Sequence, residues 1–226
     1  PRRWRLHTKL TLSTYLILVF VGALALALTE WNNPATLGAI DTPSKILNAM
    51  LAGVNSRSSG ISALNVGSMR SQTHFVQDIL MMIGGGSAST AGGVKVTTFA
   101  VLVLAVIAEA RGDRDIETFG RRIPTSTVRL AVAVSLLGLA LVAISVVALL
   151  TMTDHSLDII LFETVSAFAT VGLSTGITPN LPVAAKYVLI ALMFAGRTGS
   201  MTVAAALALR ERSRVIRMPE EQPIIG

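Results

Sequence analysis

The chain has 226 residues, of which 52% are hydrophobic and 14% are charged, and its formal net charge is +6. This composition is typical of a membrane protein rather than of a soluble domain. Cysteine is absent from these residues, which excludes disulfides, thiolate metal sites and cysteine nucleophiles within them. A basic excess also occurs in nucleic-acid-binding proteins, so the positions of the cations decide its meaning.

The first half begins with residues 10–28, an uncharged apolar segment that is long enough to cross a hydrocarbon core of roughly 30 Å. Residues 44–54 are mostly apolar but too short to cross, so we expect a re-entrant helix there. A long apolar tract, 74–108, follows and contains five glycines within 84–93. Each glycine disfavours a helix by up to about 1 kcal/mol, so we expect a broken membrane helix.

The same order recurs in the second half. Residues 130–153 form a second uncharged span, residues 156–169 a second short apolar tract, and residues 186–209 a span interrupted around Arg197. We therefore expect an all-α integral membrane protein with two consecutive units of span, re-entrant pore helix and span. The predicted boundaries are 1–111 for the first unit with its glycine-rich intramembrane loop at 84–93, 112–128 for the connector, 129–217 for the second unit and 218–226 for the C-terminal tail.

Most basic residues lie before the first span, between the halves or after the last span, and the order of elements brings these places to one side. By the positive-inside rule that side is cytoplasmic, so the basic excess reports topology and both termini are expected there. The connectors 29–41 and 151–154 contain no lysine or arginine and are expected to face outward. Residues 1–28 also resemble a cleavable signal peptide, although their apolar run is long for one.

The small-residue run TVGLSTG at 170–176 follows the second short tract. In a membrane, the carbonyls of such a loop can replace a cation's hydration shell, as in the TVGYG loops of potassium channels. Aligning Gly60 with Gly172, which are 112 residues apart, indicates an internal repeat. Unpaired carbonyls at that depth are tolerated only where they line a cavity, which favours a pore. Two ordinary helical turns inside a helix bundle are the alternative.

Three passages carry a resemblance to a known family, namely SAFATVGLSTG at 166–176, GGGSASTAGGVKVTT at 84–98 and AGRTG at 195–199. Through them the chain resembles the C-terminal half of the membrane subunit of the Trk/Ktr/HKT superfamily of potassium transporters, most closely the Ktr type. The ending at 219–226 also looks like that family's, and the resemblance covers essentially the whole chain. It implies four units around one pseudo-fourfold pore, with the first two supplied by the N-terminal half of the parent chain.

The resemblance implies channel-like potassium uptake down an electrochemical gradient, with one filter glycine in each unit. The filter positions it assigns are Ser58, Ser59, Gly60, Ile61, Thr170, Val171, Gly172 and Leu173. Potassium is expected at the main-chain oxygens of Ser59, Gly60, Val171 and Gly172. The first loop reads RSSGI where the family more usually has RTAGF. This departure leaves the preference for potassium over sodium open.

The resemblance also assigns a gate below the filter to the glycine-rich loop and to an arginine in the last span. The gate residues are Gly84, Gly85, Gly86, Ser87, Ala88, Ser89, Thr90, Ala91, Gly92, Gly93, Lys95 and Arg197. Close helix packing is the alternative for the glycines. A lone mid-membrane arginine costs about 2.5–3.5 kcal/mol, so Arg197 either faces a wet path or caps carbonyls of the glycine loop. Lys95 either takes part in gating or snorkels to the cytoplasmic surface.

Other charged residues lie close to the two predicted filter loops. Glu163 either attracts cations or hydrogen-bonds the backbone of the second loop. Asp158, at the start of the same short helix, is more simply explained by the helix dipole. Arg57 is expected to point away from the pore and anchor the first loop, because a cation inside the pore would repel potassium.

Two other functional classes compete with this interpretation. A secondary carrier with broken helices is the more serious one, although duplicated short helices with small-residue loops favour a channel-like path. An intramembrane serine protease would need Ser200 beside a histidine. His7, His74 and His155 are expected near membrane ends or in connectors, so we do not expect an enzyme.

The resemblance implies a homodimeric membrane subunit in the plasma membrane and a cytosolic nucleotide-binding regulatory subunit. The connector 109–129 and the tail 210–226 are the surfaces available to that regulator. Topology and anionic lipid also explain the basic charge of these segments. We expect no covalent cofactor and no nucleic acid, with potassium as the permeant ion and sodium as a second candidate.

Overall fold

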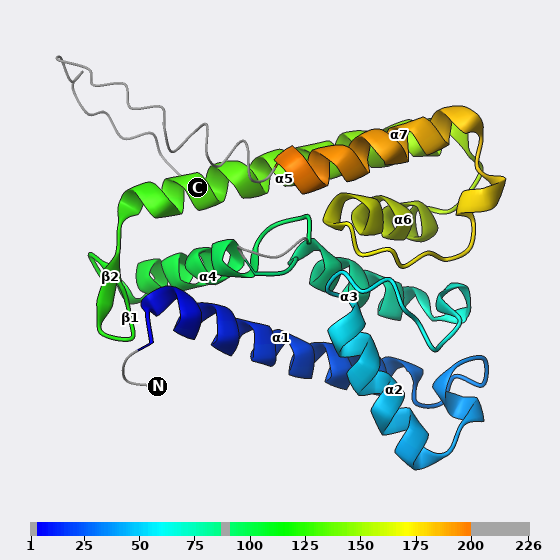
Figure 1. Cartoon of the computed structure of the whole chain (residues 1–226), viewed down its shortest axis with the longest axis horizontal. Coiled ribbons are helices and arrows are strands. Elements are labelled where there is room, and N and C mark those ends of the chain that lie inside the picture. Colours follow the sequence, from blue (N-terminus) through cyan, green and yellow to red (C-terminus); the bar gives the residue numbers. More distant parts are fainter. Residues whose placement is uncertain (1–3, 87–90, 200–226) are drawn as a thin grey trace.

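The computed structural model describes residues 4–86 and 91–199, and within these ranges the chain is mostly helical. Two helices, α1 (Leu6–Glu30) and α5 (Thr125–Met152), are long and apolar enough to cross a membrane. They coincide with the two uncharged spans of the sequence. Figure 1 shows that both run along the long axis of the molecule.

A short helix, α2 (Thr42–Asn55), follows α1 and packs across it. The Asp41 carboxylate caps this helix by accepting a hydrogen bond from Ser44 N at 3.4 Å. The crossing is close because both helices present small residues. A Cβ atom placed on Gly53 would lie only 2.6 Å from Val19 O, so any side chain there would push the helices apart.

The tract 74–108 forms two helices, α3 (Ser71–Met82) and α4 (Val96–Arg111), with the glycine-rich segment between them. After α4 the chain forms an antiparallel hairpin of β1 (Ile116–Thr118) and β2 (Arg121–Ile123). This hairpin lies within the predicted connector, for which no strand was expected. The connector is also shorter than predicted, because α5 begins at Thr125 rather than at 129.

The second half contains α6 (Leu157–Ala169) and α7 (Val183–Phe194), and α7 continues into a π-helical turn, η4 (Ala195–Gly199). Single 3-10 turns lie at Leu37–Ala39 (η1), Val66–Ser68 (η2) and Thr178–Asn180 (η3). The tail and the remainder of the last predicted span, including the basic residues at 210–217, lie outside the described residues.

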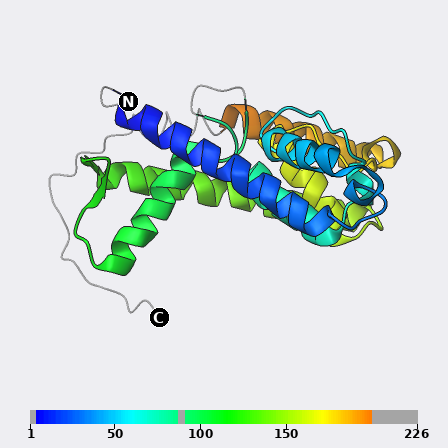
Figure 2. The same cartoon turned by 90° about the horizontal axis from the view of Figure 1, so that it is seen from below.

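The main hydrophobic core is built around α6, which packs against α3, α5 and α7. Figure 2 shows α6 enclosed by neighbouring helices at the end of the molecule where α2 also lies. Nearly every residue of α6 from Phe162 onward is buried, in contrast to α1 and α5, whose outer faces carry exposed apolar side chains. The largest fully buried apolar side chains in this core are Phe162, Leu37, Met81, Leu149 and Ile160.

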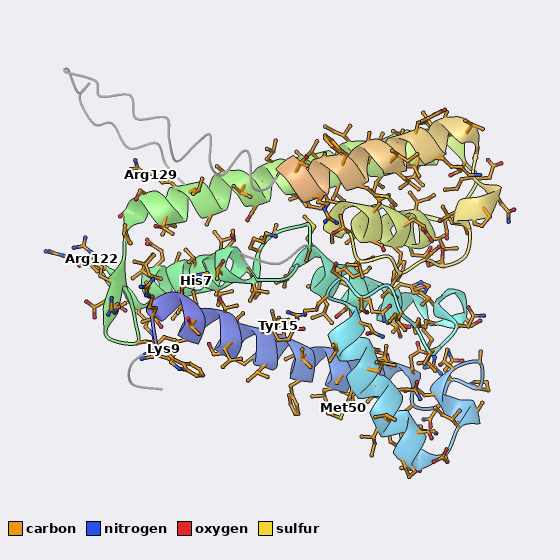
Figure 3. The ribbon with its side chains drawn as sticks, viewed as in Figure 1. His7, Lys9, Tyr15, Met50, Arg122 and Arg129 are labelled. Atoms are coloured by element: carbon orange, nitrogen blue, oxygen red, sulfur yellow. The ribbon has the colours of Figure 1, made fainter. Side chains whose placement is uncertain are left out.

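The two ends of the molecule differ in charge. Figure 3 shows His7, Lys9, Arg122 and Arg129 at the end that carries the hairpin, where α1 and α5 begin. The ion pair between Arg122 and Asp115, with N and O atoms 2.8 Å apart, lies in the same region. The short helices α2 and α6 and the loops that follow them lie toward the opposite end.

Candidate functional site

The loops that follow α2 and α6 lie against each other. A Cβ atom on Gly172 would lie 3.1 Å from Gly60 Cα, and one on Gly60 would lie 3.3 Å from Val171 O. Both glycines have positive φ angles, +66° at Gly60 and +90° at Gly172, which other residues adopt only with strain. The fold therefore brings together the two glycines that the sequence alignment made equivalent.

A hydrogen bond also joins the two loops two residues before these glycines. Ser58 Oγ donates to the main-chain oxygen of Thr170 at 2.9 Å. Both residues also have positive φ angles, +79° and +52°, which is uncommon for residues other than glycine. Ser58 and Thr170 are equivalent in the same alignment, so the contact joins matching positions of the two halves.

Side chains of the two short helices hold other carbonyls of these loops. Asn55 Nδ2 donates to Ile61 O, and Asn55 Oδ1 accepts from Ser59 Oγ at 2.7 Å. In the second half, Ser166 Oγ donates to Leu173 O at 2.6 Å. The carbonyls of Ile61 and Leu173 are thus fixed by different side chains.

In each loop, two main-chain carbonyls lie between the residues that these hydrogen bonds hold. Within the described residues, no hydrogen bond engages the main-chain oxygen atoms of Ser59, Gly60, Val171 and Gly172. Ser59, Gly60 and Gly172 are also exposed, whereas Val171 is buried, as are the anchoring residues Asn55 and Ser166. Carbonyl groups that accept no hydrogen bond, on a backbone that neighbouring side chains hold in place, are suited to coordinating a cation.

Glu163 supports the returning part of the second loop. Its buried carboxylate accepts hydrogen bonds from Ser174 Oγ (2.7 Å), from the main-chain N of Thr175 (2.7 Å) and from Thr178 Oγ1 (2.9 Å). Of the two interpretations that the sequence left open, the structure shows this scaffold contact. Asp158 lies in the first turn of α6 and accepts from Ser71 Oγ at 2.9 Å.

The two ends of the glycine-rich segment between α3 and α4 are hydrogen-bonded to each other. Gly84 N donates to Val94 O at 2.8 Å, and Val94 N donates to Met82 O at 3.1 Å, which brings the two ends of the segment together. Lys95 Nζ donates to Ala91 O at 2.5 Å, so this cation is bonded to the loop itself. Of the predicted gate residues, Ser87, Ala88, Ser89 and Thr90 lie outside the described residues.

The glycine loop docks on the C-terminal end of α6. Gly92 N lies 3.1 Å from Ala169 O and 2.8 Å from Thr170 Oγ1, and it donates to both. A Cβ atom on Gly92 would lie 2.7 Å from Phe168 O. A Cβ atom on Gly196 would meet that same carbonyl, so glycines on both sides allow the backbones to approach.

Arg197 lies in the π-helical turn η4, next to the contact of Gly196 with α6. Its side chain is exposed in the described structure. The glycine loop and the turn that carries Arg197 therefore meet at one place, the C-terminal end of α6.

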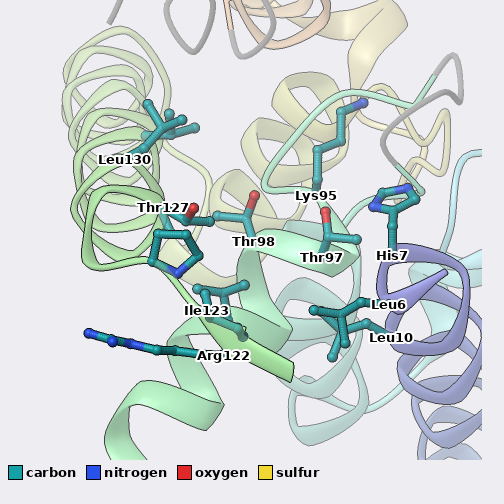
Figure 4. A pocket seen from close by; sticks show the side chains of 14 residues that line it. Leu6, His7, Leu10, Lys95, Thr97, Thr98, Arg122, Ile123, Thr127 and Leu130 are labelled. Carbon is teal, nitrogen blue, oxygen red and sulfur yellow. The ribbon is translucent and has the colours of Figure 1, made fainter. Parts of the chain in front are cut away.

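Two cavities lie away from the exposed carbonyls. A small apolar cavity of about 80 Å³ separates Gly93 and Val94 from Gly138 on α5 and Phe168 on α6. A larger one of about 350 Å³ lies between the first turns of α1, α4 and α5, near the hairpin. Figure 4 shows its mixed lining, in which leucines and Ile123 alternate with His7 and three threonines, with Lys95 and Arg122 among the lining residues.

The sequence did not reveal the polar anchors of these loops. Asn55 and Ser166 are polar residues in the last turn of each short helix, next to apolar neighbours, which is the signal that was available. Glu30 was also missed. Its fully buried carboxylate accepts from Asn33 Nδ2 at 2.6 Å and from Arg70 N at 2.9 Å, and so joins the end of α1 to the start of α3.

The TrkH family, described as cation transport protein, matches residues 1–216. The chain is 40% identical over 226 residues to Ktr system potassium uptake protein B of Bacillus subtilis (strain 168), covering 100% of this chain and 50% of that protein. It is 34% identical over 232 residues to the protein of the same name from Vibrio alginolyticus, with coverage of 100% and 51%. Potassium/sodium uptake protein NtpJ of Enterococcus hirae is 34% identical over 228 residues, with coverage of 98% and 50%.

The chain therefore spans about half the length of the curated relatives that it matches. The family match and the two long apolar helices agree on a membrane location. Because the match extends over nearly all of the sequence, the chain belongs to the TrkH family of cation transport proteins.

Proposed function

We propose that the parent protein takes up potassium through a channel-like path, and that this chain supplies two of the four units around the pore. The proposal rests on the four unengaged main-chain oxygens of Ser59, Gly60, Val171 and Gly172 on two facing loops. Three relatives named as potassium or potassium/sodium uptake proteins support a monovalent cation as the substrate. This function is transport and not an enzymatic reaction.

In this proposal α2 and α6 are re-entrant pore helices. Each ends at a glycine loop, and the partial negative charge at a helix C-terminus favours a nearby cation. Potassium enters a ring of carbonyl oxygens that replaces its water shell. The loops at Gly60 and Gly172 supply two sides of the ring, and loops from the N-terminal half of the parent chain supply the others.

The glycine loop and Arg197 form the gate in this proposal. The docked loop lies at the cytoplasmic side of the second filter loop, held there by Gly92. Arg197, on the adjacent turn, places a positive charge below the filter that repels potassium until the gate opens. An apolar cavity of about 80 Å³, lined by Val134, Leu137 and Leu141 of α5, lies beside Gly93.

The basic end of the molecule and its exposed apolar helix faces indicate what surrounds each of them. The basic end with the hairpin faces the cytoplasm of a multi-pass protein in the plasma membrane. The exposed apolar faces of α1 and α5 contact lipid, the other half of the parent chain or a second copy in a homodimer. The hairpin and the C-terminal segment are the surfaces proposed to contact a cytosolic nucleotide-binding regulator.

The test is uptake of potassium and of sodium into liposomes that contain the full-length parent protein or its Gly172→Ser variant. A side chain at Gly172 meets Gly60 Cα and is strained at φ +90°, so the facing loops must separate. We expect the potassium preference to fall by at least about tenfold, which corresponds to roughly 1.4 kcal/mol.

Gly176→Ser is the matched control. Gly176 has a similar φ of +94°, but a Cβ atom there meets nothing within 4 Å. This variant carries the backbone strain without separating the loops, so it should retain the preference. Equal ion preference in the parent and in well-inserted Gly172→Ser protein would refute the filter assignment.

A further inference from the structure

The two filter loops differ in how their returning parts are supported. The carboxylate of Glu163 holds the second loop by accepting hydrogen bonds from Ser174 Oγ and from Thr175 N, each at 2.7 Å. The alignment of Gly60 with Gly172 places Leu51 opposite Glu163. A leucine side chain accepts no hydrogen bond, so α2 does not provide the first loop with the acceptor that α6 provides for the second.

The returning parts of the two loops nevertheless share a local turn. Ser62 Oγ accepts a hydrogen bond from Leu64 N at 3.3 Å, and the aligned Ser174 Oγ accepts one from Gly176 N at 3.0 Å. The alignment of the halves therefore holds in the structure beyond the two glycines. The same backbone turn requires a support in the first half too.

The donor that needs this support is the main-chain N of Ala63, which is the residue aligned with Thr175. Within the described part of the chain, no hydrogen bond engages Ala63 N. Ile61, Ser62 and Ala63 are all exposed residues, so any protein contact that fixes this stretch has to come from its inner side.

An acceptor from another helix lies on that inner side. Gln77 of α3 is only 5% exposed, and its Oε1 has no hydrogen-bond partner among the described residues. A buried amide oxygen without a partner is unfavourable and is usually satisfied by an ordered water. Gln77, Ala63 and Leu51 line the same small cavity, together with Leu173 of the second loop. Its volume is about 10 Å³, close to what one water molecule needs.

We propose that Gln77 is a positioning residue for the first filter loop and acts through one water molecule bound in this cavity. The water donates a hydrogen bond to Gln77 Oε1 and accepts one from Ala63 N. Among the described residues that line the cavity none is charged, which suits water rather than an ion. Gln77 thus does for the first loop what Glu163 does for the second. The effect on ion preference rests on the proposed function.

This arrangement ties the first loop to a different kind of element. Glu163 belongs to the short helix that precedes its loop, whereas Gln77 belongs to the helix that follows its loop. That helix, α3, packs against both α1 and α6. The water therefore connects the first loop to the packed core of the molecule, while the residue that positions the loop does not contact the permeant ion.

The first test is Gln77→Met in the full-length parent protein, because methionine keeps the length of the side chain and removes the amide. We expect the potassium-to-sodium uptake ratio in liposomes to fall about fivefold, the factor given by loss of one ordinary hydrogen bond. Gln72→Met is the matched control, because Gln72 is an exposed residue of the same helix. It should keep the ratio of the parent.

A rescue separates support of the loop from simple packing. Adding Leu51→Gln to Gln77→Met places an amide oxygen at the position aligned with Glu163, where it can accept from Ala63 N. We expect the uptake ratio to return to within about twofold of the parent. If Gln77 only fills space, the added amide restores nothing, and the proposal is overturned.

A density map of the full-length parent that resolves ordered waters tests the site without any substitution. We expect one water peak within hydrogen-bonding distance of both Gln77 Oε1 and Ala63 N. Absence of this peak, or a parent-like uptake ratio in well-inserted Gln77→Met protein, overturns the proposal. If Gly172→Ser changes ion preference while these results fail, only the role of Gln77 is wrong; an unchanged preference in Gly172→Ser refutes the filter itself.

Discussion

The guanidinium group of Arg57 lies over the ring of Tyr15, with its central carbon 5.0 Å from the ring centroid. Arg57 is only 7% exposed, and its three nitrogen atoms have no hydrogen-bond partner among the described residues. The aromatic face is thus the contact that the structure provides for this buried cation. It ties the chain just before Ser58 to α1.

Tyr15→Leu should therefore destabilise the first filter loop. A cation–π contact contributes about 0.5–2 kcal/mol, and Leu removes it while remaining apolar. Tyr15→Phe keeps the ring and should match the parent. The measurement is thermal unfolding of the detergent-solubilised parent protein together with its potassium-to-sodium uptake ratio. Equal losses in the Phe and Leu variants would show that the ring does not hold Arg57.

Glu163→Gln and Glu163→Ala separate a scaffold role from electrostatic attraction of ions. Gln keeps an acceptor for Thr175 N, whereas Ala leaves that donor and the hydroxyl groups of Ser174, Thr175 and Thr178 without their carboxylate. We expect a loss of about 1–3 kcal/mol of stability and weaker ion preference in Ala, with Gln close to the parent. The measurements are thermal unfolding and uptake at several potassium concentrations. If Gln lowers uptake as much as Ala, the negative charge itself attracts the ion.

Arg197→Ala should raise basal potassium uptake severalfold without changing ion preference, because it removes a positive charge from the path and leaves the filter carbonyls in place. Arg197→Lys should remain close to the parent. Lys186→Ala is the matched control, since this cation lies near the other end of α7 and donates to Pro179 O at 2.7 Å. Radioactive rubidium uptake into liposomes is the assay, and a rate equal to that of the parent would show that Arg197 is structural.

Gly53→Ala should destabilise the crossing of α1 and α2. Its Cβ atom would lie 2.6 Å from Val19 O and 2.8 Å from Ala23 N, which are main-chain atoms that cannot rotate away. We expect a loss of about 1–3 kcal/mol from overpacking, measured by thermal unfolding of the full-length protein. Gly138→Ala is a milder comparison, because its nearest neighbour at 3.0 Å is the end of the Phe168 ring. Unchanged stability in Gly53→Ala would mean that the helices separate at no cost.

The sequence predicted the long helices well because an uncharged apolar run has few alternatives in a membrane protein. Both short helices end within two residues of their predicted limits, and the alignment of Gly60 with Gly172 anticipated two loops that the structure brings into contact. The hairpin was missed because strands of three residues have no readable periodicity. Its turn at Phe119 and Gly120, with φ of +51° and +71°, left only a single glycine as a signal.

The docking of Gly92 on Thr170 was also beyond the sequence. These residues are 78 positions apart, and a main-chain N–H has no sequence signature of its own. The glycine content of the loop indicated that a close approach was needed, but the surface approached is specified only by the packing of α6 among α3, α5 and α7. The local sequence pattern thus identified the helices and loops, whereas tertiary packing determines which of them are in contact.

The unequal anchoring of the two loops has a consequence for how ion preference can change. Asn55 holds the carbonyl of Ile61, whereas Ser166, one place earlier in the aligned helix, holds that of Leu173. In the proposed filter, a substitution at either anchor would alter one side of the carbonyl ring and leave the other in place. The ion preference of the proposed pore could then be changed in small independent steps, one loop at a time, by residues that do not contact the ion.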